Sequence, residues 1–169
     1  MSSTDSHSTA PLLAIFVVVF SLLFIVRGDN EELVEQNYNR SLILMEEGQF
    51  DEAKLLLEEV LQESSEHLDA LREHARMLVL TSAGEEDEQL MQAIAQVDRV
   101  LAIKPQDWKA FEVLGDARLA QADPVSAVAA YVEAAFHGER REHIDSKYKV
   151  AVTMAHQRFG AEVELAKFR

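Results

Sequence analysis

The chain has 169 residues, no cysteine and a formal net charge of −14. The lack of cysteine excludes disulfides, thiolate metal sites and a cysteine nucleophile. Few aromatic residues (7%) and many good helix formers disfavour a β-sandwich or barrel, so the composition predicts an all-α fold.

Negative charge is concentrated in the first half of the chain. Residues 29–90 contain 18 Asp/Glu against four Lys/Arg, whereas residues 91–169 contain 11 of each sign. The acidic half argues against a nucleic-acid partner, because phosphates would be repelled, and it leaves a basic protein partner possible. The simpler alternative is that these charges only solvate the exposed faces of helices.

An uncharged segment follows a polar tail over residues 1–10. Residues 10–26 form a stretch of 17 residues, about 25 Å as a helix, which is at the short end of bilayer-spanning lengths. The tail has no Lys or Arg and the segment has no good cleavage site, which disfavours a cleavable signal peptide. The sequence therefore predicts a transmembrane helix over residues 11–27 and a linker over 28–33. Arg27 and Arg40 slightly favour placing the following domain on the cytoplasmic side.

Pairs of amphipathic helices are predicted from residue 34 onward. In the clearest pair, Gly115 lies on the first helix, and Ala127 and Tyr131 lie on the second, which opens at Pro124. Two helices approach closely where small residues meet, so we expect Gly115 to face Ala127. Tracing this spacing backwards predicts three units over residues 34–67, 68–107 and 108–141, the middle one about six residues longer. Pro105 closes the middle unit.

This order of residues resembles the tetratricopeptide repeat (TPR), a unit with Leu-Gly, Ala, aromatic and Ala positions followed by Pro. The resemblance implies that an α-solenoid of about three TPR-like helix hairpins follows the predicted transmembrane helix. A capping helix and C-terminal tail are expected over residues 142–169. The sequence departs from the family pattern in places: only the third unit has Leu-Gly, and Arg118 replaces an aromatic residue.

The resemblance also implies a partner-binding groove lined by the first helix of each hairpin, suited to an extended or helical peptide segment. The family's groove positions correspond to Tyr38, Asn39, Leu42, Arg72, Glu73, Arg76, Lys109, Glu112 and Asp116. Of the positions that form a carboxylate clamp in chaperone-binding TPR proteins, only Lys109 matches, so we do not expect that clamp. The alternative interpretation is that all nine are ordinary exposed residues.

Catalytic signatures are missing from the sequence. It contains no phosphate loop, serine-hydrolase elbow or zinc-protease motif. His137, His143 and Asp145 could approach one another, but surface histidines are the simpler interpretation of that cluster. The sequence predicts no enzyme activity, no cofactor, no metal site, no small-molecule substrate and no nucleic-acid partner.

The sequence-based hypothesis is a membrane-anchored TPR adaptor or scaffold. It would bind a partner protein, through a peptide segment or a membrane-complex subunit, and support recruitment to a membrane complex or its assembly and stability. Two kinds of TPR protein fit this layout, bacterial inner-membrane assembly factors and mitochondrial outer-membrane import receptors. The compact chain without a long linker favours a single-pass protein of the bacterial inner membrane. The alternative is an accessory structural subunit of a larger membrane enzyme complex, with the repeats capping the assembly.

Overall fold

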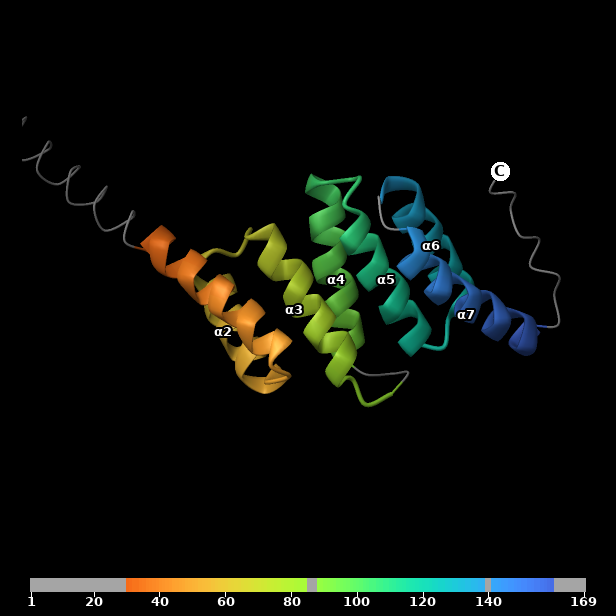
Figure 1. Ribbon diagram of the computed structural model, residues 1–169, viewed down its shortest axis with the longest axis horizontal. Helices are drawn as coiled ribbons and strands as arrows, with labels where there is room; N and C mark the ends of the chain where they lie inside the picture. Colours follow the sequence, from red (N-terminus) through yellow and green to blue (C-terminus); the bar gives the residue numbers. More distant parts are fainter. Residues whose placement is uncertain (1–29, 85–87, 139–140, 160–169) are drawn as a thin grey trace, which may run out of the picture.

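The computed structural model describes residues 30–84, 88–138 and 141–159, without the side chain of residue 141. Within these ranges the chain is helical between short turns. The helices are one over residues 30–46, then α2 (Phe50–Glu63), α3 (Leu68–Thr81), α4 (Glu88–Ile103), α5 (Trp108–Ala120), α6 (Pro124–His137) and α7 (Arg141–Phe159). They follow one another in a row from orange to blue (Figure 1). The described residues therefore form an all-α solenoid of helix hairpins.

Side chains at the turns explain where three of the helices begin. Asp107 accepts a hydrogen bond from the backbone N–H of Ala110 at 3.0 Å at the start of α5. Asp123 accepts a hydrogen bond from the backbone N–H of Ser126 at 3.2 Å at the start of α6. At the start of α3, the Nδ1 atom of His67 accepts one from the backbone N–H of Ala70. Such caps satisfy backbone donors that a helix leaves free at its N-terminus, so the local sequence sets these boundaries.

Each hairpin closes around four buried positions that recur in the same register. The four residues are Ser41, Ala53, Leu57 and Val60 in the first hairpin, Ala75, Ala93, Val97 and Val100 in the second, and Gly115, Ala127, Tyr131 and Ala134 in the third. The first position of each set is always small. A small residue there lets the two helices of a hairpin approach closely enough to exclude water.

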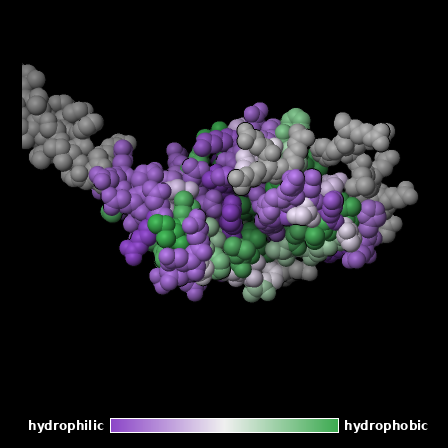
Figure 2. All heavy atoms as spheres, viewed as in Figure 1, coloured by the Kyte–Doolittle hydropathy of each residue, from purple (hydrophilic) through white to green (hydrophobic). Residues whose placement is uncertain are grey.

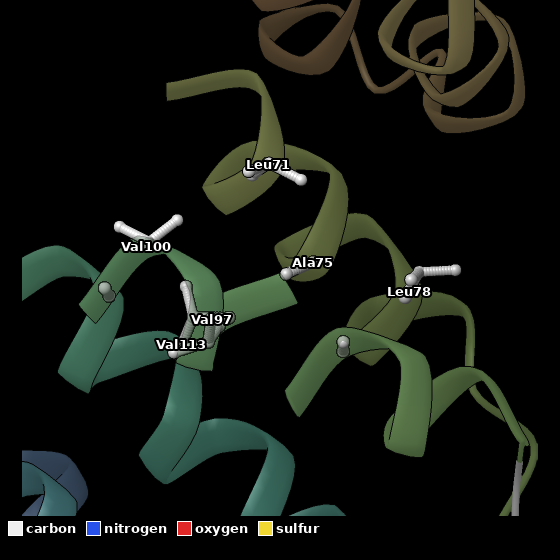
Figure 3. Packing of buried hydrophobic residues seen from close by; sticks show 8 residues of the cluster. Leu71, Ala75, Leu78, Val97, Val100 and Val113 are labelled. Atoms are coloured by element: carbon white, nitrogen blue, oxygen red, sulfur yellow. The ribbon is translucent and has the colours of Figure 1, made fainter. Parts of the chain in front are cut away.

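The hydrophobic core continues from one hairpin to the next. One cluster joins α3, α4 and α5, and its labelled members in Figure 3 are Leu71, Ala75, Leu78, Val97, Val100 and Val113. A second cluster joins the 30–46 helix to α2 and α3, and a third joins α6 to α7 through Tyr131, Ile144 and Ala151. Because each hairpin buries apolar surface against its neighbour, the solenoid is stabilised as a continuous stack.

The first helices of the hairpins lie along the inner side of the stack. Among the described elements α3 contacts α5 directly, whereas α2 and α4, or α4 and α6, share few contacts at most. The 30–46 helix, α3, α5 and α7 also run in one direction, from upper left towards lower right in Figure 1. We call the side formed by these four helices the inner face, and α2, α4 and α6 the outer helices.

The predicted transmembrane helix requires a correction. Within residues 30–84, 88–138 and 141–159, no helix is both long and apolar enough to cross a membrane. The longest helix with assigned bounds, α7, has 19 residues and carries charged side chains along its length. The segment 11–27 and the tail 1–10 lie outside the described residues. We therefore replace the membrane-anchored fold class by an all-α solenoid and withdraw the single-pass location in a bacterial inner membrane.

Candidate partner-binding face

The nine residues predicted to line a groove lie on the 30–46 helix, α3 and α5, but they differ widely in accessibility. Arg72, Glu73 and Glu112 are buried, with 5, 7 and 8% of their surface exposed. Tyr38, Leu42, Arg76 and Asp116 are half-buried, and Asn39 and Lys109 are exposed. The three buried residues form ion pairs with other residues of the protein.

Arg72 ties α3 to the start of α5. Its guanidinium lies 3.0 Å from Asp107, 2.7 Å from Asp69 and 3.4 Å from Glu73. Burial alone would raise the pKa of Asp69, but the neighbouring Arg72 charge brings that pKa below its usual value. Since Asp107 also caps α5, one arginine links the two helices through a shared carboxylate. Arg72 therefore has a structural role. Glu73 forms ion pairs with both Arg72 and Arg76, and each guanidinium Nε lies 3.4 Å from a Glu73 carboxylate oxygen.

A second network holds α7 against α5. Lys147 Nζ lies 2.7 Å from Glu112 Oε1 and 2.6 Å from Asp116 Oδ2, and His143 Nε2 lies 2.9 Å from the same Glu112 oxygen. Burial opposes ionisation of Glu112, but the hydrogen bonds from Lys147 and His143 lower its pKa below the usual value. Asp116 also accepts a 2.7 Å hydrogen bond from the Tyr131 hydroxyl. These carboxylates are therefore already engaged within the protein.

One register position links each inner helix to the beginning of the next. It is occupied by Tyr38, Arg72 and Glu112, which contact His67, Asp107 and His143, respectively. The Tyr38 and His67 rings lie 4.8 Å apart between centroids. Burial, followed by the negative charges of Glu73 and Asp69, raises the pKa of Tyr38 to about 12. The side chains at this position therefore contact the following hairpin or capping helix and are not free to bind a ligand.

The sequence analysis did not predict the linking roles of His67, Asp107, His143 and Lys147, although it named His143 in a possible histidine cluster. A signal was present for two of them. His67 and Asp107 each stand immediately before the first residue of a predicted unit, where a helix cap is expected. For His143 and Lys147 the sequence holds no comparable local signal, because their partners lie 31 to 35 residues away.

The accessible part of the inner face includes an open pocket between the beginnings of α3 and α5. Its volume is about 630 Å³, and it is lined by Asp69, Arg72, Lys104, Pro105, Gln106, Asp107, Trp108 and Lys109. Lys109 Nζ lies 5.8 Å from the centroid of the Trp108 ring. The pocket therefore combines an indole surface with charged groups of both signs, which suits a polar side chain or a backbone segment more than a purely apolar ligand.

Apolar side chains gather at the other end of the inner face, in the last turns of its helices. We call Leu42, Met45, Val79, Leu80 and Leu119 the apolar strip; Leu80 is 60% exposed and the others are half-buried. Figure 2 shows hydrophobic residues in the lower middle and right of this view, and hydrophilic residues over much of the rest, including the bottom of the first hairpin. Of the strip, the sequence analysis had selected only Leu42.

The histidines considered for metal binding have other contacts. His143 pairs with Glu112, while His137 lies 3.6 Å from Glu133 and stacks on Phe111 with ring centroids 6.1 Å apart. Among the residues that the structure describes, no group of three or more His, Asp or Glu side chains is placed to hold a metal ion. The structure therefore gives these histidines roles in helix packing.

Comparison with protein-family descriptions and with curated proteins finds no match to this sequence. Solved structures do match: the TPR domain of P58(IPK) has a TM-score of 0.67 at 16% identity and covers 81% of this chain, which spans only 38% of that one. The Arabidopsis OM64 TPR domain has a TM-score of 0.64 at 15% identity, covering 73% of this chain and 98% of its own. The Sgt2 TPR domain from Aspergillus fumigatus has a TM-score of 0.63 at 16% identity, covering 73% and 80%. The described helices therefore form a TPR-like fold.

Proposed function

We propose that the protein is an adaptor or scaffold that binds a segment of a partner protein along its inner face. The observation that carries the proposal is the accessible surface between the pocket at the start of α5 and the apolar strip. It offers apolar anchors and a few polar groups on rigid helices, which is what recognition of a peptide segment requires. The TPR-like fold supports this choice of face, because such solenoids present an extended concave surface.

The internal ties support the proposal by holding the inner helices in place before a partner binds. Arg72 joins α3 to α5, and Lys147 joins α5 to α7. Because the surface is already ordered, binding would not require ordering of the helices, and less of the interaction free energy is lost. The proposed binding surface is smaller than the nine-residue groove predicted from the sequence. It is centred on Leu42, Arg76 and Lys109, and the buried ion pairs lie beneath it.

A permanent subunit of a larger assembly is the second candidate. It is favoured by large apolar side chains on the outer helices, where Leu55, Met91 and Phe136 are 60, 59 and 70% exposed. Such a subunit would dock through its outer helices. The two candidates therefore differ in the side of the solenoid that a partner covers.

The test begins with peptides selected from a random display library against the full chain. Hydrogen–deuterium exchange is then measured with and without a selected peptide. The proposal expects slower exchange in the 30–46 helix, α3 and the first turn of α5, and unchanged exchange in the outer helices α4 and α6. Protection confined to the outer helices, or a failure to select any peptide, would reject the inner face as the binding surface.

A further inference from the structure

We infer that the partner segment is cationic and amphipathic, with apolar side chains that lie on the apolar strip and Lys or Arg side chains that face the acidic first hairpin. This inference rests on the proposed function and adds the chemistry of the partner. It follows from the distribution of charge, from the position of the apolar strip and from the composition of the pocket.

The first hairpin carries most of the protein's net negative charge. Residues 30–84 contain 13 Asp/Glu and four Lys/Arg, a net charge of −9, whereas residues 88–138 and 141–159 together contain nine acidic and eight basic residues. Arg72 and Arg76 pair with the two carboxylates of α3, Asp69 and Glu73, so the excess of negative charge lies on the first hairpin. Such an uneven distribution attracts positively charged segments to this end of the solenoid and repels negative ones.

Part of the apolar strip lies at this end of the solenoid. Leu42 and Met45 are on the 30–46 helix, which ends at Glu46; Glu46 and the following Glu47 are both exposed. Leu80, at the end of α3, leaves 60% of its surface exposed. A surface that places leucines beside carboxylates is complementary to a segment with apolar residues on one side and basic residues on the other.

An acidic segment is the main competitor, because Lys104 and Lys109 line the pocket. Asp69 and Asp107 line the same pocket, however, and both lie against Arg72. The pocket therefore has little positive charge to offer. An acidic segment that reached it would still have to avoid the carboxylates of the first hairpin, and it would gain nothing from the apolar strip.

The experiment measures binding of three fluorescent peptides to the full chain by anisotropy. Each has ~18 residues, five helical turns. The first places Leu on one face and Lys on the other, the second replaces every Lys by Glu, and the third has the composition of the first in scrambled order. We expect the first peptide to bind at least about tenfold more tightly than either of the others. Its affinity should fall when the salt concentration is raised from about 50 to about 300 mM, since salt screens exposed charges.

Two pairs of substitutions test separately whether the apolar strip and the acidic residues contribute to binding of the Leu/Lys peptide. Leu42→Ser with Leu80→Ser, and Glu46→Lys with Glu47→Lys, should each weaken binding of the Leu/Lys peptide by about tenfold. Met91→Ser is the control for the strip, because Met91 on α4 is as exposed as Leu80, and circular dichroism verifies that each variant folds.

The inference is overturned if the Leu/Glu or scrambled peptide binds as tightly as the Leu/Lys peptide, if no peptide binds, or if both pairs of substitutions leave binding unchanged. The peptides selected from the random library distinguish a failure of this inference from a failure of the proposed function. Acidic or uncharged selected peptides that still protect the inner helices would retain the inner face as a binding surface and reject a cationic partner.

Discussion

Gly115 on α5 lies directly beneath the ring of Tyr131 on α6. A Cβ atom placed on Gly115 would come within 2.4 Å of Tyr131 Cε1, and its three nearest heavy atoms all belong to that ring. The sequence analysis had expected Gly115 to face Ala127. The tyrosine fills the space that the missing side chain leaves, and its hydroxyl donates to Asp116, one residue beyond the glycine. Among the equivalent inner residues Ser41, Ala75 and Gly115, the glycine is the smallest. Among the equivalent outer residues Leu57, Val97 and Tyr131, the tyrosine is the largest, so the third hairpin combines the smallest inner residue with the largest outer one.

The first prediction concerns this contact. In Gly115→Ala the added methyl group forces the Tyr131 ring to move, which costs about 1–3 kcal/mol. Alanine returns about 1 kcal/mol of helix propensity, so the free energy of unfolding should fall by up to about 2 kcal/mol. Thermal unfolding followed by circular dichroism measures the change. Gly84→Ala is the control, since nothing lies within 4 Å of a Cβ there.

A double-mutant cycle identifies Tyr131 as the cause. If the ring is the obstacle, Gly115→Ala should cost less in a Tyr131→Leu background than in the natural chain. Equal costs in the two backgrounds would show that the glycine is needed for another reason.

The second prediction concerns two equivalent turns that join the helices of the first and third hairpins. Gly48 has φ +76° and Ala122 has φ +53°, so both turns use the left-handed region. This conformation costs a residue with a side chain about 1–2 kcal/mol. Ala122→Gly should therefore raise the free energy of unfolding by up to about 1 kcal/mol, after the larger entropy loss of glycine. Gly48→Ala should lower it by about 1 kcal/mol. Urea unfolding measures both, and shifts of the same sign would contradict the expectation.

The third prediction concerns the tie between α5 and α7. Lys147→Met removes the ammonium group from Glu112, which is only 8% exposed, and should cost about 1–3 kcal/mol because a buried carboxylate loses a partner. Amide exchange in α7 should accelerate more than exchange in α3. Lys149→Met, at an exposed position of the same helix, should change the free energy of unfolding by less than about 0.5 kcal/mol. Similar losses in both variants would refute the structural role of Lys147.

The fourth prediction concerns pH. The pKa of Glu112 in the folded protein lies below its ordinary value of about 4.3, so the unfolded chain binds the proton more readily. The resulting stabilisation is complete above about pH 4.3 and is lost as the pH falls through the lower, folded pKa. Asp69 and Asp123 shift in the same direction. Chemical unfolding at a series of pH values should show Glu112→Gln losing less stability over this acidic range than the natural chain. Parallel curves would contradict the assignment.

The solenoid was predictable because its packing depends on residue size at regular spacing. Pro105, Gly115 and Ala127 were enough to indicate helix hairpins, since close approach of helices and tight turns leave few choices of residue. The transmembrane prediction rested on the length, hydropathy and flanks of the 11–27 segment. It is withdrawn because no helix within the described residues is long and apolar enough to cross a membrane.

The candidate site was less predictable, because family positions place residues on a face without showing what they contact. Arg72 and Glu112 lie on the inner helices as expected, but Asp107 and Lys147, each 35 residues further along, engage their charges. Whether a charged side chain is free depends on three-dimensional neighbours that periodicity cannot supply. The exposed strip residue Leu80 was missed for the complementary reason: a leucine within a helix pattern is normally assigned to the core.

The most direct test of the inner face as a binding surface is site-specific photo-crosslinking to a selected peptide. A photoreactive side chain is introduced at Leu80 in one variant and at Met91 in another; the two residues are 60 and 59% exposed, on an inner and an outer helix, respectively. If a partner segment binds along the inner face, the peptide crosslinks from position 80 and not from position 91. Crosslinking from position 91 alone, or equally from both positions, would contradict the account.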